Sequence, residues 1–203
     1  MKKTNNKGFS LVELIIVIAI MAILAGAIAP ALIKYIDKSR RSNDVSSCKT
    51  IKTAIETALG NESLYEYLTT GADFAYIYIT PGGGLAASEG TAADTIKISG
   101  AATEDINGKT AEELDKIAKN QIGTTIGEKA PKLKFKKDPS GKKSSTNVPT
   151  EFVGVVSKSG TVYVYISCTT AGTMKVKEDG GEVVIDTAET GYQICPNIAD
   201  EYQ

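Results

Sequence analysis

LIIVIAIMAILAGAIAPALI, residues 14–33, is a run of twenty residues without a charged side chain. As an α-helix, this run would be about 30 Å long, which is enough to cross the hydrocarbon core of a bilayer. Lys2, Lys3 and Lys7 lie before the run, and most of the chain follows it. This charge distribution predicts that residues 1–8 stay in the cytoplasm and that the C-terminal part of the chain lies outside the membrane.

Two ordinary interpretations fit this pattern: a secretory signal peptide, with small residues at 25–27 for cleavage, and a plain membrane anchor. Neither requires Glu13, which directly precedes the apolar run. At the centre of a bilayer an acidic residue costs about 2.5–3.5 kcal/mol on insertion scales, and near the interface the cost is smaller. The position of Glu13 therefore favours a functional role.

A third interpretation supplies that role. A cut between Gly8 and Phe9 would create a new α-amino group four residues before Glu13. An amine and a carboxylate attract strongly at low dielectric, and either group left unpaired is costly. The amine of an incoming chain could pair with the Glu13 of a chain already packed, which would fix the axial register of neighbouring helices.

The sequence KGFSLVE, residues 7–13, followed at once by the apolar run, resembles the prepilin N-terminus of type IV pilins and pseudopilins. The resemblance covers about residues 7–58. It implies cleavage after Gly8 by a prepilin peptidase, N-methylation of Phe9 and subunit pairing through Glu13. It also implies two kinds of partner, further copies of the chain in a helical polymer and the pilus assembly machinery in the membrane.

Pro30 falls where pilins of this kind often carry a helix-kinking proline, whereas many relatives have a mid-span glycine at the position of Ala22. In this chain the glycine is Gly26 instead. Proline and glycine both weaken a helix, so we expect local melting around residues 26–30 on assembly.

The chain divides into five expected segments. Residues 1–8 are a removable leader, 9–33 a transmembrane and filament-core helix, and 34–60 the amphipathic second half of that helix. Its apolar positions recur at helical spacing up to Leu59, and Gly60-Asn61 is a stop signal. Residues 61–150 form a mixed region and 151–203 an antiparallel sheet with a C-terminal tail.

Local patterns predict elements within the last two segments. We expect a short helix at 62–68 and short strands at 74–79 and 95–99. A capping box at 110–113 should open a further helix, and residues 136–149 should form a loop. Strands at 151–157, 161–169, 173–178 and 182–186 are separated by short turns, which is typical of an antiparallel meander. The predicted fold is α+β, with the long helix packed on this sheet, as the pilin resemblance also implies.

Three cysteines are too few for a disulfide framework. Cys168 ends a strand and Cys195 lies near the C-terminus. A disulfide between them would stabilise the fold by about 3–4 kcal/mol, because it lowers the conformational entropy of the unfolded chain. Many relatives bridge a C-terminal segment in this way, so the resemblance favours the Cys168–Cys195 pair. Cys48 lies on the apolar helical face and is expected to be a buried small hydrophobe.

Composition argues against several other functions. The chain has no histidine, which removes the commonest general base and zinc ligand, so we expect no catalytic residue, metal or cofactor. The net charge of −1 and the solvated lysine cluster at 132–143 give no specific nucleic-acid site. With 6% aromatic residues and no tryptophan, the chain gives little support for carbohydrate binding on stacked rings.

These observations predict a structural subunit, a major pilin of a type IV pilus used for adhesion, motility or aggregation. The precursor would be a single-pass protein of the cytoplasmic membrane, and the product an extracellular filament. A pseudopilin of a type II secretion or DNA-uptake system is the alternative within the family. A membrane-anchored or secreted binding module is the alternative of another class.

Overall fold

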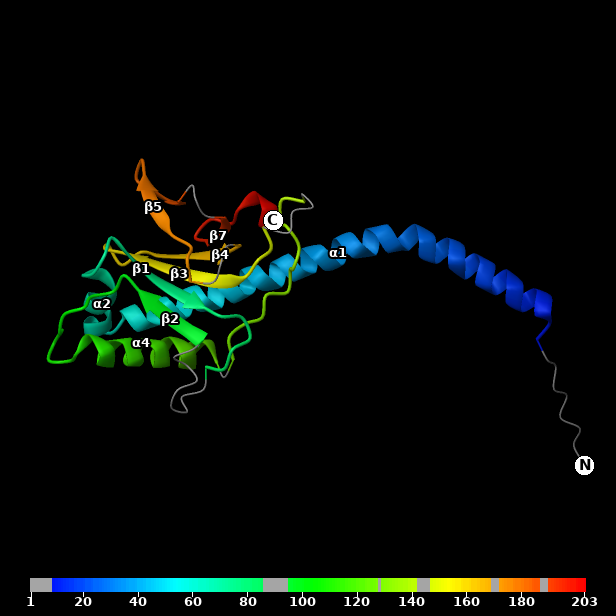
Figure 1. Ribbon diagram of the computed structural model, residues 1–203. Coiled ribbons are helices and arrows are strands. Elements are labelled where there is room, and N and C mark those ends of the chain that lie inside the picture. The colour runs from blue at the N-terminus through cyan, green and yellow to red at the C-terminus, as the bar shows by residue number, and fades with distance from the viewer. Residues whose placement is uncertain (1–8, 86–94, 128, 142–146, 169–171, 187–189) are drawn as a thin grey trace, which may run out of the picture. The chain divides into compact units, whose positions relative to one another are not determined.

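The computed structural model describes residues 9–85, 95–127, 129–141, 147–168, 172–186 and 190–203. The chain forms two compact units, Met1–Ser39 and Arg40–Gln203, and the boundary falls inside its longest helix. In chain order the elements are α1 (Leu11–Leu59), α2 (Glu62–Thr69), β1 (Phe74–Ile79), β2 (Ile96–Ser99), α4 (Ala111–Ile126), β3 (Glu151–Ser157), β4 (Val162–Ser167), β5 (Val176–Asp179), β6 (Glu182–Ile185), β7 (Gly191–Cys195) and the 3-10 turn η1 (Asp200–Tyr202) (Figure 1).

In the first unit, α1 is helical without interruption, through both Gly26 and Pro30. Every described side chain from Phe9 to Lys34 is exposed in the isolated chain. The helix that the sequence predicts from near Phe9 to Leu59 is confirmed, because α1 runs from Leu11 to Leu59.

In the second unit, α1 buries one side. Its buried residues recur three or four positions apart, as one face of an α-helix requires: Asp44, Val45, Cys48, Ile51, Ala54, Ile55 and Ala58. The helix ends at Leu59, and the side chain of Asn61 then caps α2 by accepting hydrogen bonds from two of its first backbone N–H groups. The amphipathic pattern of residues 34–60 thus marks the part of the helix that packs on the rest of the second unit, residues 60–203, which we call the head.

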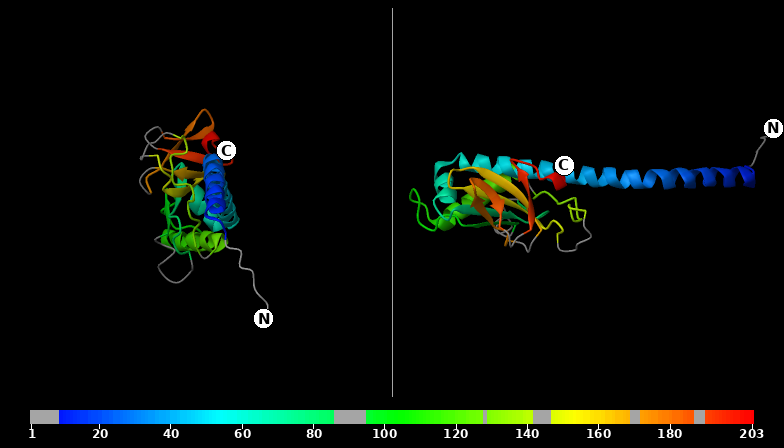
Figure 2. Two further views of the ribbon diagram at one scale, coloured as in Figure 1. Left: turned by 90° about the vertical axis from the view of Figure 1, so that its right-hand side faces the viewer. Right: turned by 90° about the horizontal axis from the view of Figure 1, so that it is seen from above.

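The main sheet has the strand order β2-β1-β3-β4-β7, and all its neighbouring strands are antiparallel. Its inner face packs against α1, α2 and α4 in a large apolar core that includes Ile55, Ile77, Leu114 and Val164. A separate two-stranded sheet, the β5–β6 hairpin, covers part of the outer face (Figures 1 and 2). Two cores therefore lie on opposite faces of one sheet.

Helix α4 begins at the predicted capping box. The hydroxyl of Thr110 accepts from the backbone N–H of Glu113, and the Glu113 carboxylate accepts from the N–H of Thr110 at 2.9 Å. These hydrogen bonds lower the pKa of the Glu113 carboxyl below its usual value. The predicted helix at 62–68 and the strands at 74–79 and 95–99 are confirmed to within a residue or two.

The predicted meander is only partly correct. β3 pairs with β4 and β5 pairs with β6, but β4 pairs with β7 and not with β5. Gly191–Cys195, for which the sequence predicts only a tail, is the edge strand β7. The hairpin leaves the main sheet because it buries Val176 and Val183 against the outer face, where the aromatic side chains of the sheet would otherwise be exposed.

Candidate functional site

The start of α1 holds the predicted assembly residues. The backbone N–H of Ser10 donates to Oε2 of Glu13 at 2.9 Å, and the N–H of Leu14 donates to the carbonyl of Ser10 at 3.2 Å. Phe9 is 90% exposed, and Gly8 lies outside the described residues. The carboxylate of Glu13 is thus held in the first turn of the helix, where the backbone N–H groups favour a negative charge.

This contact is half of a capping box, the pattern in which a serine is followed three residues later by a glutamate. The spacing of Ser10 and Glu13 gives that signal in the sequence, but the assembly hypothesis does not use it. Its consequence is that the Glu13 carboxylate has a partner inside its own chain. An amine from another chain would therefore take over a carboxylate that already accepts one hydrogen bond.

The apolar part of α1 presents an unusually complete apolar surface. From Phe9 to Ile36, seventeen large apolar side chains are exposed, from 41% for Ile36 to 90% for Phe9. By length and composition, α1 is the one helix among the described residues that could cross a membrane. A helix that is apolar all round needs a lipid or protein environment, and the first unit supplies none.

Gly26 and Pro30 both lie within this helix. A Cβ added at Gly26 would meet nothing within 4 Å, so no packing contact in the chain requires glycine there. Pro30 removes one backbone N–H from the helical ladder, which weakens the turn around it. The expected melting on assembly stays a prediction, because α1 is helical at both residues in the single chain.

Beyond the apolar segment, α1 is fastened to the head by two charged side chains. The carboxylate of Asp44 accepts from the backbone N–H groups of Lys134 and Phe135 at 2.7 and 3.0 Å. The guanidinium of Arg41 lies 4.5 Å from the centre of the Phe135 ring and donates to the carbonyl of Glu201 at 2.7 Å. Burial raises the pKa of Asp44, and the two backbone hydrogen bonds oppose that shift.

This fastening corrects one expectation from the sequence and adds a residue that the sequence did not indicate. Asp44 is fully buried against its own head. The lysine-rich segment at 132–143 is predicted to be a solvated loop, yet Leu133 and Phe135 are buried within it while Lys134 and Lys136 are exposed. Alternation of apolar residues and lysines is the sequence signal that could have indicated this packing.

The cysteines do not form the expected bond. Cys48, Cys168 and Cys195 are all buried free thiols. Cys195 lies opposite Val164 in the β4–β7 register, four residues from Cys168, which corresponds to about 13 Å along a strand. A disulfide needs Cα atoms closer than about 7 Å, so this register keeps Cys168 and Cys195 apart. Cys48 is a buried small hydrophobe, as predicted.

Comparison with known proteins agrees with this arrangement. A family model, the prokaryotic N-terminal methylation motif, matches residues 3–29. The chain is 33% identical over 133 residues to the type IV major fimbrial protein FimA of Dichelobacter nodosus, covering 63% of this chain and 76% of that relative. It is 48% identical over 54 residues to fimbrial protein Q of Moraxella bovis, covering 27% of this chain and 34% of the relative.

A relative of another kind is the type II secretion system core protein G of Klebsiella michiganensis. The identity there is 34% over 65 residues, covering 32% of this chain and 46% of the relative. No solved structure matches the chain. An exposed apolar helix with an acidic residue in its first turn, followed by an α+β head, defines the class of pilin-like proteins. Because the similarity to FimA covers most of that relative, the chain belongs to the type IV pilin family.

Proposed function

We propose that the chain is a major subunit of a type IV pilus, whose N-terminal helix polymerises into an extracellular filament for adhesion, motility or aggregation. The observation that carries this proposal is the apolar surface from Phe9 to Ile36, which is exposed in the single chain. In a filament, the same surface would be buried by the helices of neighbouring copies. Burial of apolar area is the main driving force for such association.

Processing would precede polymerisation. The precursor would cross the cytoplasmic membrane once, with residues 1–8 inside, until a prepilin peptidase cuts between Gly8 and Phe9. Methylation of the new N-terminus at Phe9 would follow, and the pilus assembly machinery would extract the subunit. The match of residues 3–29 to the N-terminal methylation motif supports the processing at this end of the chain.

Glu13 would select the register of assembly. Within one chain its carboxylate accepts from the Ser10 N–H at 2.9 Å. In the filament, the positive amine of Phe9 from another copy would replace or share that contact. A charge-assisted hydrogen bond is stronger than a neutral one, and an unpaired carboxylate in an apolar bundle is costly. This exchange of partners at Glu13 would therefore favour one axial offset between neighbouring helices over the others.

A pseudopilin is the second candidate, supported by the similarity to the type II secretion core protein G. That similarity spans 65 residues, whereas the similarity to FimA spans 133 and therefore extends far beyond the 49 residues of α1 into the head. The greater coverage of the head favours a pilin.

The test replaces Glu13 by alanine in the producing cells. We expect the Glu13→Ala chain to insert and to be cleaved normally, while the yield of filaments sheared from the cells falls at least tenfold. Glu56→Ala is the matched control, because Glu56 is a half-exposed acid on the same helix whose partner is Lys52, four residues earlier. Normal filament yield from Glu13→Ala would refute the assembly role.

Mass spectrometry of the N-terminal peptide completes the test. Sheared filaments should contain chains that begin at N-methylated Phe9. Chains that begin near residues 27–31 and are free in the medium would show an ordinary secreted protein and contradict the proposal. Processed chains confined to the membrane would favour the pseudopilin.

A further inference from the structure

The outer face of the main sheet is rich in aromatic side chains. The antiparallel register places Tyr76 beside Val155 and Val155 beside Tyr163. It also sets Tyr78, Val153 and Tyr165 in a second row, so that each row reads aromatic, valine, aromatic. Although aromatic residues make up only 6% of the chain, the fold gathers four of its nine tyrosines on one face, with Phe74 at the end of β1.

Three of these tyrosines hold the β5–β6 hairpin by its backbone. Tyr78 donates to the carbonyl of Met174 at 2.8 Å and Tyr165 donates to the carbonyl of Val183 at 3.1 Å. The hydroxyl of Tyr76 lies 3.3 Å from both the carbonyl and the N–H of Val176.

The fourth, Tyr163, is different: it is half-buried, and no hydroxyl partner is found for it among the described residues. Tyr163 packs against the apolar cluster under the hairpin, but the hairpin does not engage its hydroxyl.

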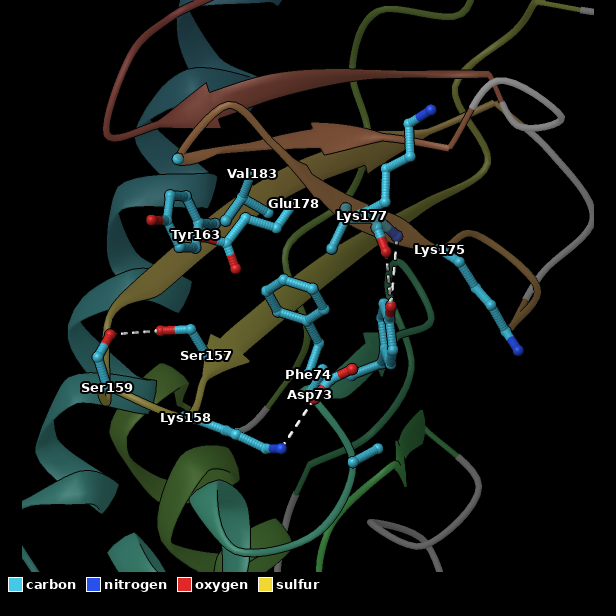
Figure 3. Close-up of a pocket in the computed structure, with 14 residues that line it drawn as sticks. Asp73, Phe74, Ser157, Lys158, Ser159, Tyr163, Lys175, Lys177, Glu178 and Val183 are labelled. Atoms are coloured by element: carbon cyan, nitrogen blue, oxygen red, sulfur yellow. Dashed lines mark hydrogen bonds and ion pairs between the residues drawn. The ribbon is translucent and has the colours of Figure 1, made fainter.

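Beside Tyr163, a cleft of about 810 Å³ lies between the sheet and the hairpin. Phe74, Tyr76 and Tyr163 contribute aromatic rings to its lining, and Val183 contributes an apolar side chain from β6. Figure 3 shows Phe74, Tyr163 and Val183 together with Glu178 of β5 around the hollow. The cleft is open to solvent and belongs wholly to the second unit.

The rim of the cleft combines hydrogen-bond donors and acceptors. The hydroxyls of Ser157 and Ser159 lie 2.8 Å apart, and the ammonium of Lys158 donates to the Asp73 carboxylate at 2.8 Å (Figure 3). These groups are exposed, so the pair is only weakly held and can exchange partners. Further charged residues on the hairpin are Lys175, Lys177 and Glu178, which leaves three ammonium and two carboxylate groups without a dominant sign.

From this arrangement we infer that the cleft is a saccharide-binding site. A sugar ring has apolar C–H faces and a rim of hydroxyls, each of which donates and accepts. The lining matches both parts, because the half-buried ring of Tyr163 offers an apolar surface while the serines, lysines and carboxylates supply donors and acceptors. In small-ligand sites, polar groups that converge on a cleft fix the orientation of the ligand.

An extended peptide fits the cleft less well. Peptides that add to a sheet use the free N–H and C=O groups of an edge strand. The cleft is floored by β1, β3 and β4, each of which is paired with a strand on both sides. On the hairpin, the N–H and carbonyl of Val176 are already engaged by Tyr76. On the floor of the cleft, recognition must therefore come from side chains, which suits hydroxyl-rich ligands.

Calorimetry on the full-length chain in detergent micelles tests the inference without requiring filaments. The probes are cellohexaose and xylohexaose for plant polysaccharides, N-acetylchitohexaose for amino-sugar polymers, and lactose and 3′-sialyllactose for animal glycans. We expect one of these three groups to bind with a dissociation constant of about 1 mM or tighter. The group that binds identifies the source of the saccharide.

Two substitutions locate the binding. Tyr163→Ala, which removes a ring, should weaken binding at least tenfold, and Glu178→Gln should weaken it about threefold. Glu182→Gln is the matched control, because Glu182 lies on the same hairpin but does not line the cleft. Unchanged thermal unfolding of each variant excludes a general loss of structure.

The inference is overturned if none of the five saccharides binds, or if binding survives both cleft substitutions unchanged. Sheared filament yield is measured in parallel and should be the same for Tyr163→Ala and the unmodified chain. A chain that forms no filaments but binds saccharide in micelles would contradict the proposed pilus function while supporting the cleft.

Discussion

The two parts of α1 are built for different partners. Up to Ser39 the helix exposes nearly all its apolar side chains, and Ile18 is 54% exposed. From Arg40 onward it buries one face completely, and Ile55 is 0% exposed. The second part finds its apolar partner in its own head, whereas the first part finds none within its unit.

The difference shows that apolar content alone does not tell which surface a helix will use. In the first part apolar residues surround the helix, which suits a membrane or a bundle of identical helices. In the second part they follow one stripe, which suits a single sheet face. Substitutions in the two parts should therefore affect different properties, assembly for the first and folding for the second.

The largest effect on folding is expected from Ile55→Ala. Truncating a buried isoleucine costs about 2–5 kcal/mol through lost transfer energy and the cavity left behind. The matched change Ile18→Ala should leave the unfolding free energy of the head unchanged, since Ile18 lies in the first unit. Denaturant titration in detergent, followed by near-ultraviolet circular dichroism of the tyrosines, measures both. Equal losses would refute the division of the helix.

Asp44→Ala should cost about 2–4 kcal/mol at neutral pH, because the backbone N–H groups of Lys134 and Phe135 lose their acceptor. Glu56→Ala, on the exposed side of the same part of α1, should cost less than about 0.5 kcal/mol. The comparison of the two unfolding free energies measures how firmly this part of the helix is fastened.

The Asp44 effect should also depend on pH. Since burial raises the pKa of Asp44 above its ordinary value of 3.8, the folded state binds its proton more tightly than the unfolded state. The proton-linked part of the Asp44 contribution is therefore fully present below pH 3.8 and is lost as the pH rises through the raised pKa. The hydrogen bonds to Lys134 and Phe135 supply the cost that remains at neutral pH. A stability difference between the unmodified chain and Asp44→Ala that grows over this window would contradict the assignment.

Gly154→Ala should cost about 1–3 kcal/mol by overpacking. The added Cβ would collide with the Cδ1 methyl of Ile55, which lies directly over the glycine. Ile55→Val removes that methyl, so the double variant should lose less than the sum of the two single variants. Additive losses would show that the collision is relieved elsewhere.

The smallest effect on folding is expected from Gly26→Ala. Alanine favours a helix over glycine by about 1 kcal/mol, and the open space around Gly26 accepts the methyl group. The head should unfold as before, while the yield of sheared filaments should fall if residues 26–30 must melt on assembly. An unchanged yield would show that melting does not depend on Gly26.

The sequence predicts α1 and its change of character well, because an uninterrupted apolar run and a helical stripe are local patterns. It also predicts most strands, since Phe74–Ile79 and Val162–Ser167 are rich in β-branched and aromatic residues. Pairing is harder to predict. Strands adjacent in sequence are usually adjacent in space, and that rule fails between β4 and β5.

The candidate sites divide in the same way. Glu13 is predictable because an acid beside an apolar run is conspicuous, and the capping contact with Ser10 follows from their spacing. Asp44 is not predictable, because a polar stretch gives no sign that one of its carboxylates will accept two distant backbone N–H groups. The cleft at Tyr163 depends on the register of β3 and β4 and on where the hairpin ends, which are both tertiary properties.

The tyrosine contacts to the hairpin have an evolutionary consequence. The hydroxyls of Tyr76, Tyr78 and Tyr165 hydrogen-bond to backbone atoms of Val176, Met174 and Val183. The hairpin also connects β4 and β7, which already pair with each other. Exposed positions of the hairpin can therefore mutate without loosening its anchors or changing the order of strands. Such a segment can vary in sequence at its exposed positions while the order and pairing of the main strands stay constant.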